Sequence, residues 1–158
     1  MKKRSALLLA ALLSLALVGC AKEEVRVPTV GEVSETVLTE NAPIVMEVTD
    51  ETVARDAEEI SLKVTNSSDE AYSFGEASRV EVFSAGAWHT LESAEGESSF
   101  DVVAIAHILP AEGTADATVR LALYGNRFDA GTYRVIKEFS PENGGETVTV
   151  AAEFEIGE

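Results

Sequence analysis

In the stretch TVTVAAEFEI, residues 147–156, apolar side chains occupy every second position. Its even-numbered positions are all apolar, whereas its odd-numbered positions hold threonine, alanine or glutamate. Because successive side chains of a β-strand point to opposite faces, this pattern predicts a strand with one face in a core and the other in water. The turn-forming run Pro141 to Gly145 precedes it. The chain is therefore expected to close on a half-buried strand.

Short β-rich runs separated by turn clusters extend back from this strand to Pro43, with no helical stripe of three turns. The run Phe100–Leu109 is apolar on both faces, so we expect it to be central. Seven or eight strands in about 115 residues favour an all-β fold, a β-sandwich. Nine runs are candidates for these seven or eight strands: residues 44–48, 60–65, 71–74, 79–84, 88–91, 100–109, 118–123, 133–139 and 147–156.

The N-terminus has the layout of an export signal. Three basic residues at positions 2–4 precede an apolar run, Ala6–Val18, which is too short for a comfortable membrane span. The tetrapeptide Leu17-Val18-Gly19-Cys20 resembles the lipobox of bacterial lipoproteins, which implies cleavage before Cys20 and a diacylglycerol on its sulfur. The alternative is an ordinary secretory signal with a chance cysteine. Cys20 is the only cysteine, so lipidation leaves no thiol for a disulfide, a metal or catalysis.

This interpretation divides the chain into three parts. Residues 1–19 are expected to be the signal peptide, and residues 20–42 the lipidated cysteine and a flexible tether. A first strand near Thr36 to Leu38 is the alternative for part of that tether. Residues 43–158 are expected to form the sandwich domain, held by the lipid on the extracytoplasmic face of the cell membrane.

Several motifs between Pro43 and Ile156 resemble the immunoglobulin-like domain of bacterial cell-envelope lipoproteins. The resemblance implies an immunoglobulin-like β-sandwich. Two departures from its pattern are Ala111, at a position where a turn glycine is expected, and the absence of a cysteine pair. The motifs are Asn66, Phe74-Gly75-Glu76, Val80-Glu81, Trp88, Ile108-Leu109-Pro110-Ala111-Glu112, Gly131-Thr132-Tyr133-Arg134 and Ala152-Glu153-Phe154.

Two aromatic residues are expected to have structural roles. Gly131-Thr132-Tyr133, at the start of a late strand, fits a tyrosine corner, in which the phenol hydroxyl bonds to backbone upstream. Trp88, the only tryptophan, is predicted to be a core anchor, with a ligand platform as the alternative.

The net charge restricts the partners. The chain carries 28 acidic and 12 basic residues, a net charge of −16. Removal of residues 1–19 takes away three basic residues and leaves a net charge of −19. Nucleic acid is excluded as a partner because binding it depends on Lys and Arg at the phosphates, and anionic lipid should repel the domain as a whole.

The sequence contains no motif that indicates catalysis. It has no G-x-S-x-G elbow, phosphate-binding Gly-Lys-Ser loop or H-E-x-x-H helix, and its only imidazoles, His89 and His107, are on different candidate strands. With Cys20 lipidated and Met46 the only methionine left, a blue-copper site is not supported. Glu153 and Glu155 could contact calcium, but no EF-hand pattern accompanies them.

We therefore predict a non-enzymatic interaction module without a cofactor or metal. Its partners would be the membrane, through Cys20, and an envelope protein or glycan. The expected contact loops are Ser84–Trp88, Glu92–Ser99 and Gly125–Gly131. The alternative is an exported metal-binding or metal-sensing protein that uses the acidic surface or the pair His89 and His107.

Overall fold

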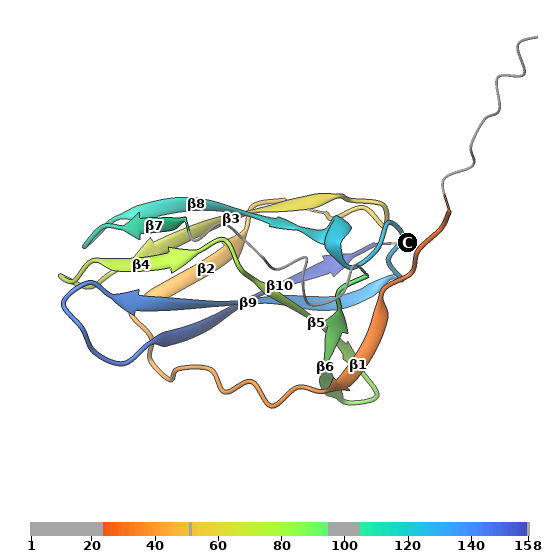
Figure 1. The fold of residues 1–158 in the computed structure, drawn as a ribbon, viewed down its shortest axis with the longest axis horizontal. Coiled ribbons are helices and arrows are strands. Elements are labelled where there is room, and N and C mark those ends of the chain that lie inside the picture. Colours follow the sequence, from red (N-terminus) through yellow and green to blue (C-terminus); the bar gives the residue numbers. More distant parts are fainter. Residues whose placement is uncertain (1–23, 51, 95–104, 158) are drawn as a thin grey trace, which may run out of the picture.

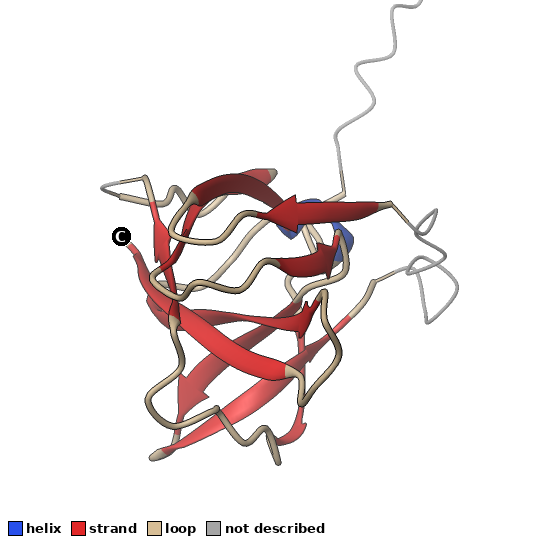
Figure 2. Ribbon diagram, turned by 90° about the vertical axis from the view of Figure 1, so that its left-hand side faces the viewer, coloured by secondary structure: helices blue, strands red, loops and turns tan. Residues whose placement is uncertain are grey.

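The computed structural model describes residues 24–50, 52–94 and 105–157, which form two antiparallel sheets packed face to face (Figures 1 and 2). Within these ranges no helix is long and apolar enough to cross a bilayer. The strands are β1 (Thr29–Val33), β2 (Ile44–Val48), β3 (Glu59–Asn66), β4 (Tyr72–Gly75), β5 (Arg79–Ser84), β6 (Ala87–Glu92), β7 (Ala106–Leu109), β8 (Thr114–Arg120), β9 (Gly131–Pro141) and β10 (Val148–Ile156). The predicted all-β sandwich is confirmed, with nine of these strands after Pro43 rather than seven or eight.

The long strand β9 organises the larger sheet, whose order is β1-β6-β5-β9-β4-β7. On one edge β9 pairs with β10 along its length, from Gly131 opposite Ile156 to Phe139 opposite Val148. On the other edge it pairs first with β5 and then with β4. All five apolar even-numbered residues of β10 are buried, as the alternation predicts.

The smaller sheet has the order β2-β3-β8, and the core lies between the two sheets. Leu62 and Val64 of β3 enter it from the smaller sheet, and Val135 and Phe139 of β9 enter it from the larger one. All four side chains are completely or almost completely buried.

Two predicted strands differ in the structure. Of the run 100–109, residues 100–104 lie outside the described residues, and β7 is an edge strand with Ile108 53% exposed, so its predicted central position is wrong. Residues Leu121–Leu123 form a 3-10 helix rather than a continuation of β8. The Leu121 carbonyl accepts a hydrogen bond from the amide of Tyr124. Leu121 is therefore buried by a helical turn and not by the alternation of side chains along a strand.

The segment 24–42 is not a free tether, so that part of the prediction is wrong. Strand β1 pairs with β6, and beyond it the Thr39 amide donates to the Thr149 carbonyl at 2.9 Å. The segment therefore lies along the domain from its first described residue, and the alternative strand at 36–38 is not formed. Its partners are distant in sequence, which explains why no local pattern revealed them. Residues 20–23 lie outside the described residues.

The β5–β6 hairpin offers a test of backbone strain. Both central residues of its turn, Ala85 and Gly86, have positive φ (51° and 84°), as in a type I′ turn, which prefers Asn-Gly. Asparagine tolerates the left-handed conformation better than alanine does. We expect Ala85→Asn to raise the free energy of unfolding in urea by about 0.5–1 kcal/mol. Ala130→Asn, at an exposed position without positive φ, should not; an equal gain would contradict the explanation.

Candidate functional site

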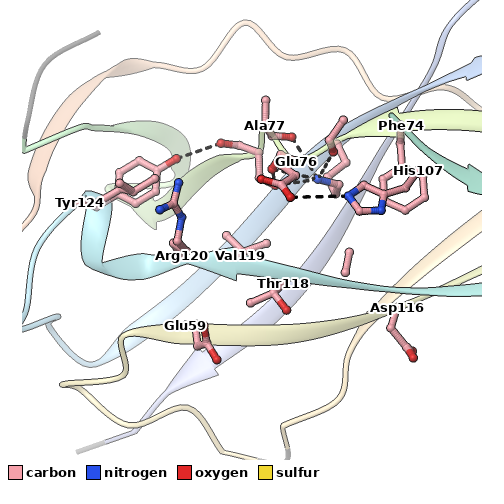
Figure 3. Close-up of a pocket in the computed structure, with 15 residues that line it drawn as sticks. Glu59, Phe74, Glu76, Ala77, His107, Asp116, Thr118, Val119, Arg120 and Tyr124 are labelled. Carbon is pink, nitrogen blue, oxygen red and sulfur yellow. Dashed lines mark hydrogen bonds and ion pairs between the residues drawn. The ribbon is translucent and has the colours of Figure 1, made fainter. Parts of the chain in front are cut away.

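A groove of about 420 Å³ lies between the two sheets (Figure 3). Residues Asp116–Arg120 of β8 form one wall, and the turn from Phe74 to Ser78, which joins β4 to β5, forms the other. Lys137 of β9 and His107 of β7 also line it. The groove thus brings together residues from both sheets, and its lining carries both signs of charge.

Lys137 is almost completely buried and is held by the β4–β5 turn. Its ammonium donates to the carbonyls of Gly75 and Ala77 at 2.9 and 3.1 Å and to Ser78 Oγ at 2.9 Å, with the Glu76 carbonyl at 3.4 Å. Burial lowers the pKa of Lys137 from 10.5 to about 8, and the nearby negative charge of Glu76 opposes this effect. Lys137 therefore closes the β4–β5 turn by binding its carbonyls.

Ser78 and Lys137 are as close as a nucleophile and its general base, but the hydrogen bond between them runs in the wrong direction for that role. A general base must accept the hydroxyl proton. Here the ammonium donates to Ser78 Oγ, and the Ser78 hydroxyl donates to the Glu76 carbonyl at 3.3 Å. The two carbonyls at 2.9 and 3.1 Å hold the remaining ammonium protons, so the arrangement is that of a structural clamp.

The two histidines are in different environments. His107 stacks on Phe74 with ring centroids 5.3 Å apart, and its Nε2 lies 3.7 Å from Glu76 Oε1. His89 lies on β6, with Nδ1 3.3 Å from the Gly31 carbonyl. Strands β5, β9 and β4 separate β6 from β7, and Met46 is in the core. The suggested histidine pair is not formed, and no group of three metal-ligating side chains occurs in the described ranges.

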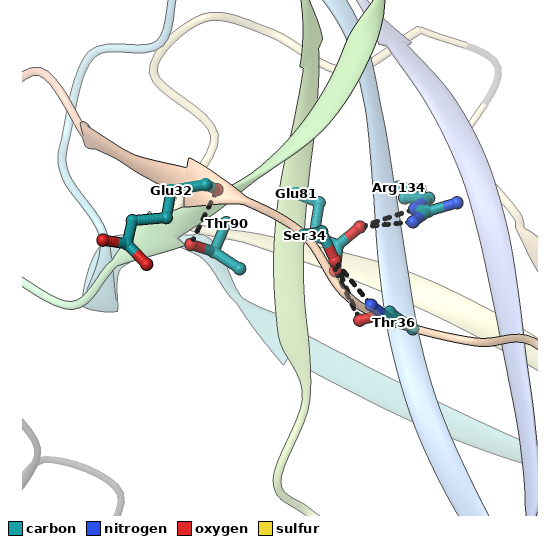
Figure 4. A network of polar contacts seen from close by, with 6 residues as sticks. All are labelled: Glu32, Ser34, Thr36, Glu81, Thr90 and Arg134. Carbon is teal, nitrogen blue, oxygen red and sulfur yellow. Dashed lines mark hydrogen bonds and ion pairs between the residues drawn. The ribbon is translucent and has the colours of Figure 1, made fainter.

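A second polar cluster lies on the outer face of the larger sheet, where Ser34 and Thr36 cross β5 (Figure 4). Glu81 is fully buried, and one of its carboxylate oxygens accepts a hydrogen bond from Arg134 Nε at 2.7 Å and forms an ion pair with Arg134 Nη2 at 2.6 Å. Its other oxygen accepts the hydroxyls of Ser34 and Thr36 at 2.6 and 2.9 Å. The Trp88 ring lies 4.3 Å from the guanidinium carbon.

Opposing effects act on the pKa of Glu81. Burial raises it, but the hydrogen bonds from Ser34, Arg134 and Thr36 and the charge of Arg134 together hold it below its usual value of 4.5. The carboxylate thus stays ionised, and the cluster fastens the N-terminal segment to the sheet. The only indication of this cluster in the sequence was Glu81, an acidic residue that follows Val80 within a strand-like run.

The structure places the residues that the sequence analysis expected to be structural, and only some of them lie where they were expected. The Tyr133 hydroxyl donates to the Asp129 carbonyl, four residues upstream, at 2.8 Å, and Gly131 begins β9. Trp88 is only partly buried and lies on the outer face with Phe83, so its prediction as a core anchor is wrong. Trp88 is paired with Phe83 across the hairpin. Because the adjacent residue Val82 packs against the core, Phe83 and Trp88 point to the opposite face of the sheet. Cys20 lies outside the described residues.

The expected contact loops are only partly brought together. The Ala94 amide donates to the Leu123 carbonyl, so the described part of Glu92–Ser99 lies beside the loop that leads into Gly125–Gly131. The turn of Ser84–Trp88 is at the opposite end of β6 from Glu92. Residues 95–99 lie outside the described residues.

The pKa of Lys137 leads to a pH-dependent prediction. Because the folded-state pKa lies below the unfolded value, the unfolded chain binds more protons between about pH 8 and 10.5, and rising pH there favours folding. We expect the stability of the wild type to rise relative to Lys137→Met between about pH 7 and 9.5. Urea unfolding at each pH measures it. Lys63→Met, at an exposed position on β3, is the control, and equal pH profiles for the two variants would contradict the prediction.

Two sheets packed around one core, with a tyrosine bonded upstream of the long strand β9, define an immunoglobulin-like sandwich. The profile of the family described as Bacterial Ig-like domain matches residues 40–155, and the chain belongs to that family. Domains of this kind are interaction modules of the extracellular type and are typically non-catalytic.

No curated protein matches the chain. Among solved structures it is similar, at 13% identity and a TM-score of 0.35, to the Pseudomonas fluorescens alkylpurine DNA glycosylase AlkC bound to DNA containing an abasic site analog. The alignment covers 75% of this chain and 31% of that chain, so this chain spans less than a third of that protein.

Proposed function

We propose that this chain is an exported, lipid-anchored and non-enzymatic Ig-like module that binds an envelope protein or glycan at the extracytoplasmic face of the membrane. The observation that carries the proposal is Leu17-Val18-Gly19-Cys20, which places the only cysteine directly after a basic and then apolar leader. The Ig-like domain that follows is the kind of domain expected at an exposed surface.

The geometry of the groove supports a binding rather than a catalytic role. Lys137, whose pKa is lowered by burial, donates its protons to two carbonyls and to Ser78, so it is not available as a general base. The histidines are far apart in the sheet order. No observation in the described ranges favours the metal-binding alternative.

The groove also offers an edge for a partner. Among the described strands β8 pairs only with β3, and residues 116–120 of β8 line the groove along its other edge. An extended segment of a partner could add to such an edge through backbone hydrogen bonds. Phe74 and His107 on the opposite wall would then contact its side chains.

Replacement of the cysteine tests the anchor. We expect the wild type to incorporate radiolabelled palmitate and to sediment with membranes, and Cys20→Ala to do neither, because Cys20 carries the only thiol of the chain. Gly19→Ala keeps a small residue before the cysteine and should behave as the wild type does. Unchanged sedimentation of Cys20→Ala would refute lipid anchoring. Where the anchor is found, crosslinking on intact cells followed by affinity capture of the lipidated chain identifies the envelope protein or glycan that it binds.

A further inference from the structure

The sandwich has two ends that differ in composition. One, the anchor-side end, consists of residues 24–28, 52–58 and 120–130. Hydrogen bonds join its parts, from the Asn126 amide to the Arg26 carbonyl at 2.9 Å and from the Phe128 amide to the Arg55 carbonyl at 2.7 Å. The other, the far end, consists of residues 39–43, 66–71, 110–113 and 141–147. Figure 1 shows the β9–β10 turn at this far end and the start of the described chain at the anchor-side end.

The N-terminal segment is fastened at the anchor-side end. The Asn126 side chain accepts a hydrogen bond from the Arg26 amide at 2.7 Å and donates one to the Glu24 carbonyl at 2.9 Å. A Cβ on Gly125 would lie 2.5 Å from the Arg26 carbonyl oxygen, so only glycine allows this approach. Cys20 precedes Glu24 by four residues, which span at most about 14 Å. A lipid on Cys20 therefore holds this end close to the bilayer.

The charges favour the same orientation. The far end carries six carboxylates and no lysine or arginine, whereas the anchor-side end carries four arginines and four carboxylates. Strand β9 joins the two ends through 11 residues, about 35 Å. That length is several times the Debye length of about 8 Å at physiological salt. The six carboxylates of the far end are thus too far from anionic lipid to be repelled by it when the domain stands on its anchor-side end.

We infer that the anchor-side end rests on the lipid headgroups, with Arg26 and Arg127 on the phosphates. This inference rests on the proposed lipid anchor. Both arginines are exposed, and neither forms an ion pair with a described residue. Arginine binds phosphate through paired N–H groups. Val25 and Val27, 68% and 53% exposed, flank Arg26 and supply apolar contact at the headgroup boundary. The loop 125–131, expected to contact a partner, then faces lipid.

The test uses the mature lipidated chain in vesicles of phosphatidylethanolamine and phosphatidylglycerol that contain nitroxide-headgroup lipid. Lipidation blocks the only native thiol, so an introduced cysteine carries the only fluorescent label. Ala130→Cys and Asn143→Cys place exposed labels beyond the two ends of β9. We expect the label at 130 to be quenched several-fold more than the label at 143. Equal quenching, or stronger quenching at 143, overturns the inference.

Two further variants separate its parts. Gly125→Ala should detach the N-terminal segment and reduce quenching at 130, whereas Gly75→Ala, with no atom nearer than 3.9 Å to the added Cβ, should not. Arg26→Gln combined with Arg127→Gln should also reduce quenching at 130, and no reduction overturns the phosphate contacts. A chain that does not float with vesicles refutes the lipid anchor itself, whereas a chain that floats with equal quenching refutes only the orientation.

Discussion

Glu81→Ala is expected to destabilise the domain by about 3–5 kcal/mol, because it leaves the Arg134 guanidinium buried without its counter-charge. The hydroxyls of Ser34 and Thr36 lose their acceptor in the same change, so the N-terminal segment loses an attachment to β5. Urea unfolding at neutral pH measures the loss. Protection of residues 34–36 against hydrogen exchange should fall with it.

The matched control is an exposed ion pair on the same sheet. Glu138 lies 3.6 Å from Arg79, and both side chains are more than half exposed, so Glu138→Ala should cost less than about 1 kcal/mol. Glu81→Leu combined with Arg134→Met should recover most of the loss, since no charge is then left unpaired. A loss at Glu81 no larger than that at Glu138 would contradict the interpretation.

The same carboxylate contributes to acid sensitivity. Its folded-state pKa lies below the usual 4.5, so its contribution to stability is complete above that value and is lost as the pH falls through the folded-state pKa. The wild type should therefore lose more stability on acidification than the double variant does.

Asn66→Ala is expected to cost about 2–4 kcal/mol, because one buried amide satisfies several groups at the far end. Its Nδ2 donates to the carbonyls of Glu70 and Pro110 at 2.7 and 2.9 Å, and its Oδ1 accepts the amide and the hydroxyl of Ser68. Alanine can replace none of these bonds. Thermal and urea unfolding measure the effect.

Two substitutions calibrate this result. Asn66→Asp keeps the acceptor but loses both donors and places a carboxylate beside two carbonyls, so it should be at least as damaging as alanine. Asn143→Ala, in the exposed β9–β10 turn, should change stability by less than about 0.5 kcal/mol. Equal effects at positions 66 and 143 would show that Asn66 does not join these loops.

Much of the fold could be predicted because its signal is local. Period-two alternation identified β3 and β10, and turn residues separated β5 from β6. The same reasoning failed for Trp88, since hydrophobicity alone does not say which face of a sheet a residue occupies. It failed for residues 24–42 because their hydrogen bonds go to β6, β10 and the loop at Asn126, up to more than a hundred residues away.

The candidate sites were less predictable than the fold. Lys137 and Glu81 are single charged residues within strands, a pattern equally typical of a solvated face. Their roles depend on which groups reach them: three carbonyls of a turn in one case, and an arginine with two hydroxyls in the other. Such groups converge only when separate strands pair, so no spacing along the chain encodes them.

The sequence by itself determined the all-β class, the alternating core face of the closing strand and the strong acidic charge, because each is a property of neighbouring residues or of composition. It also predicts the lipid anchor on Cys20. Only the tertiary structure decided that the segment before Pro43 is hydrogen-bonded to the sheet and that Lys137 is a clamp. It also decided that the far end gathers six carboxylates without a basic residue, while the anchor-side end has as many arginines as carboxylates. These features depend on long-range pairing, which sets distances that the order of residues does not.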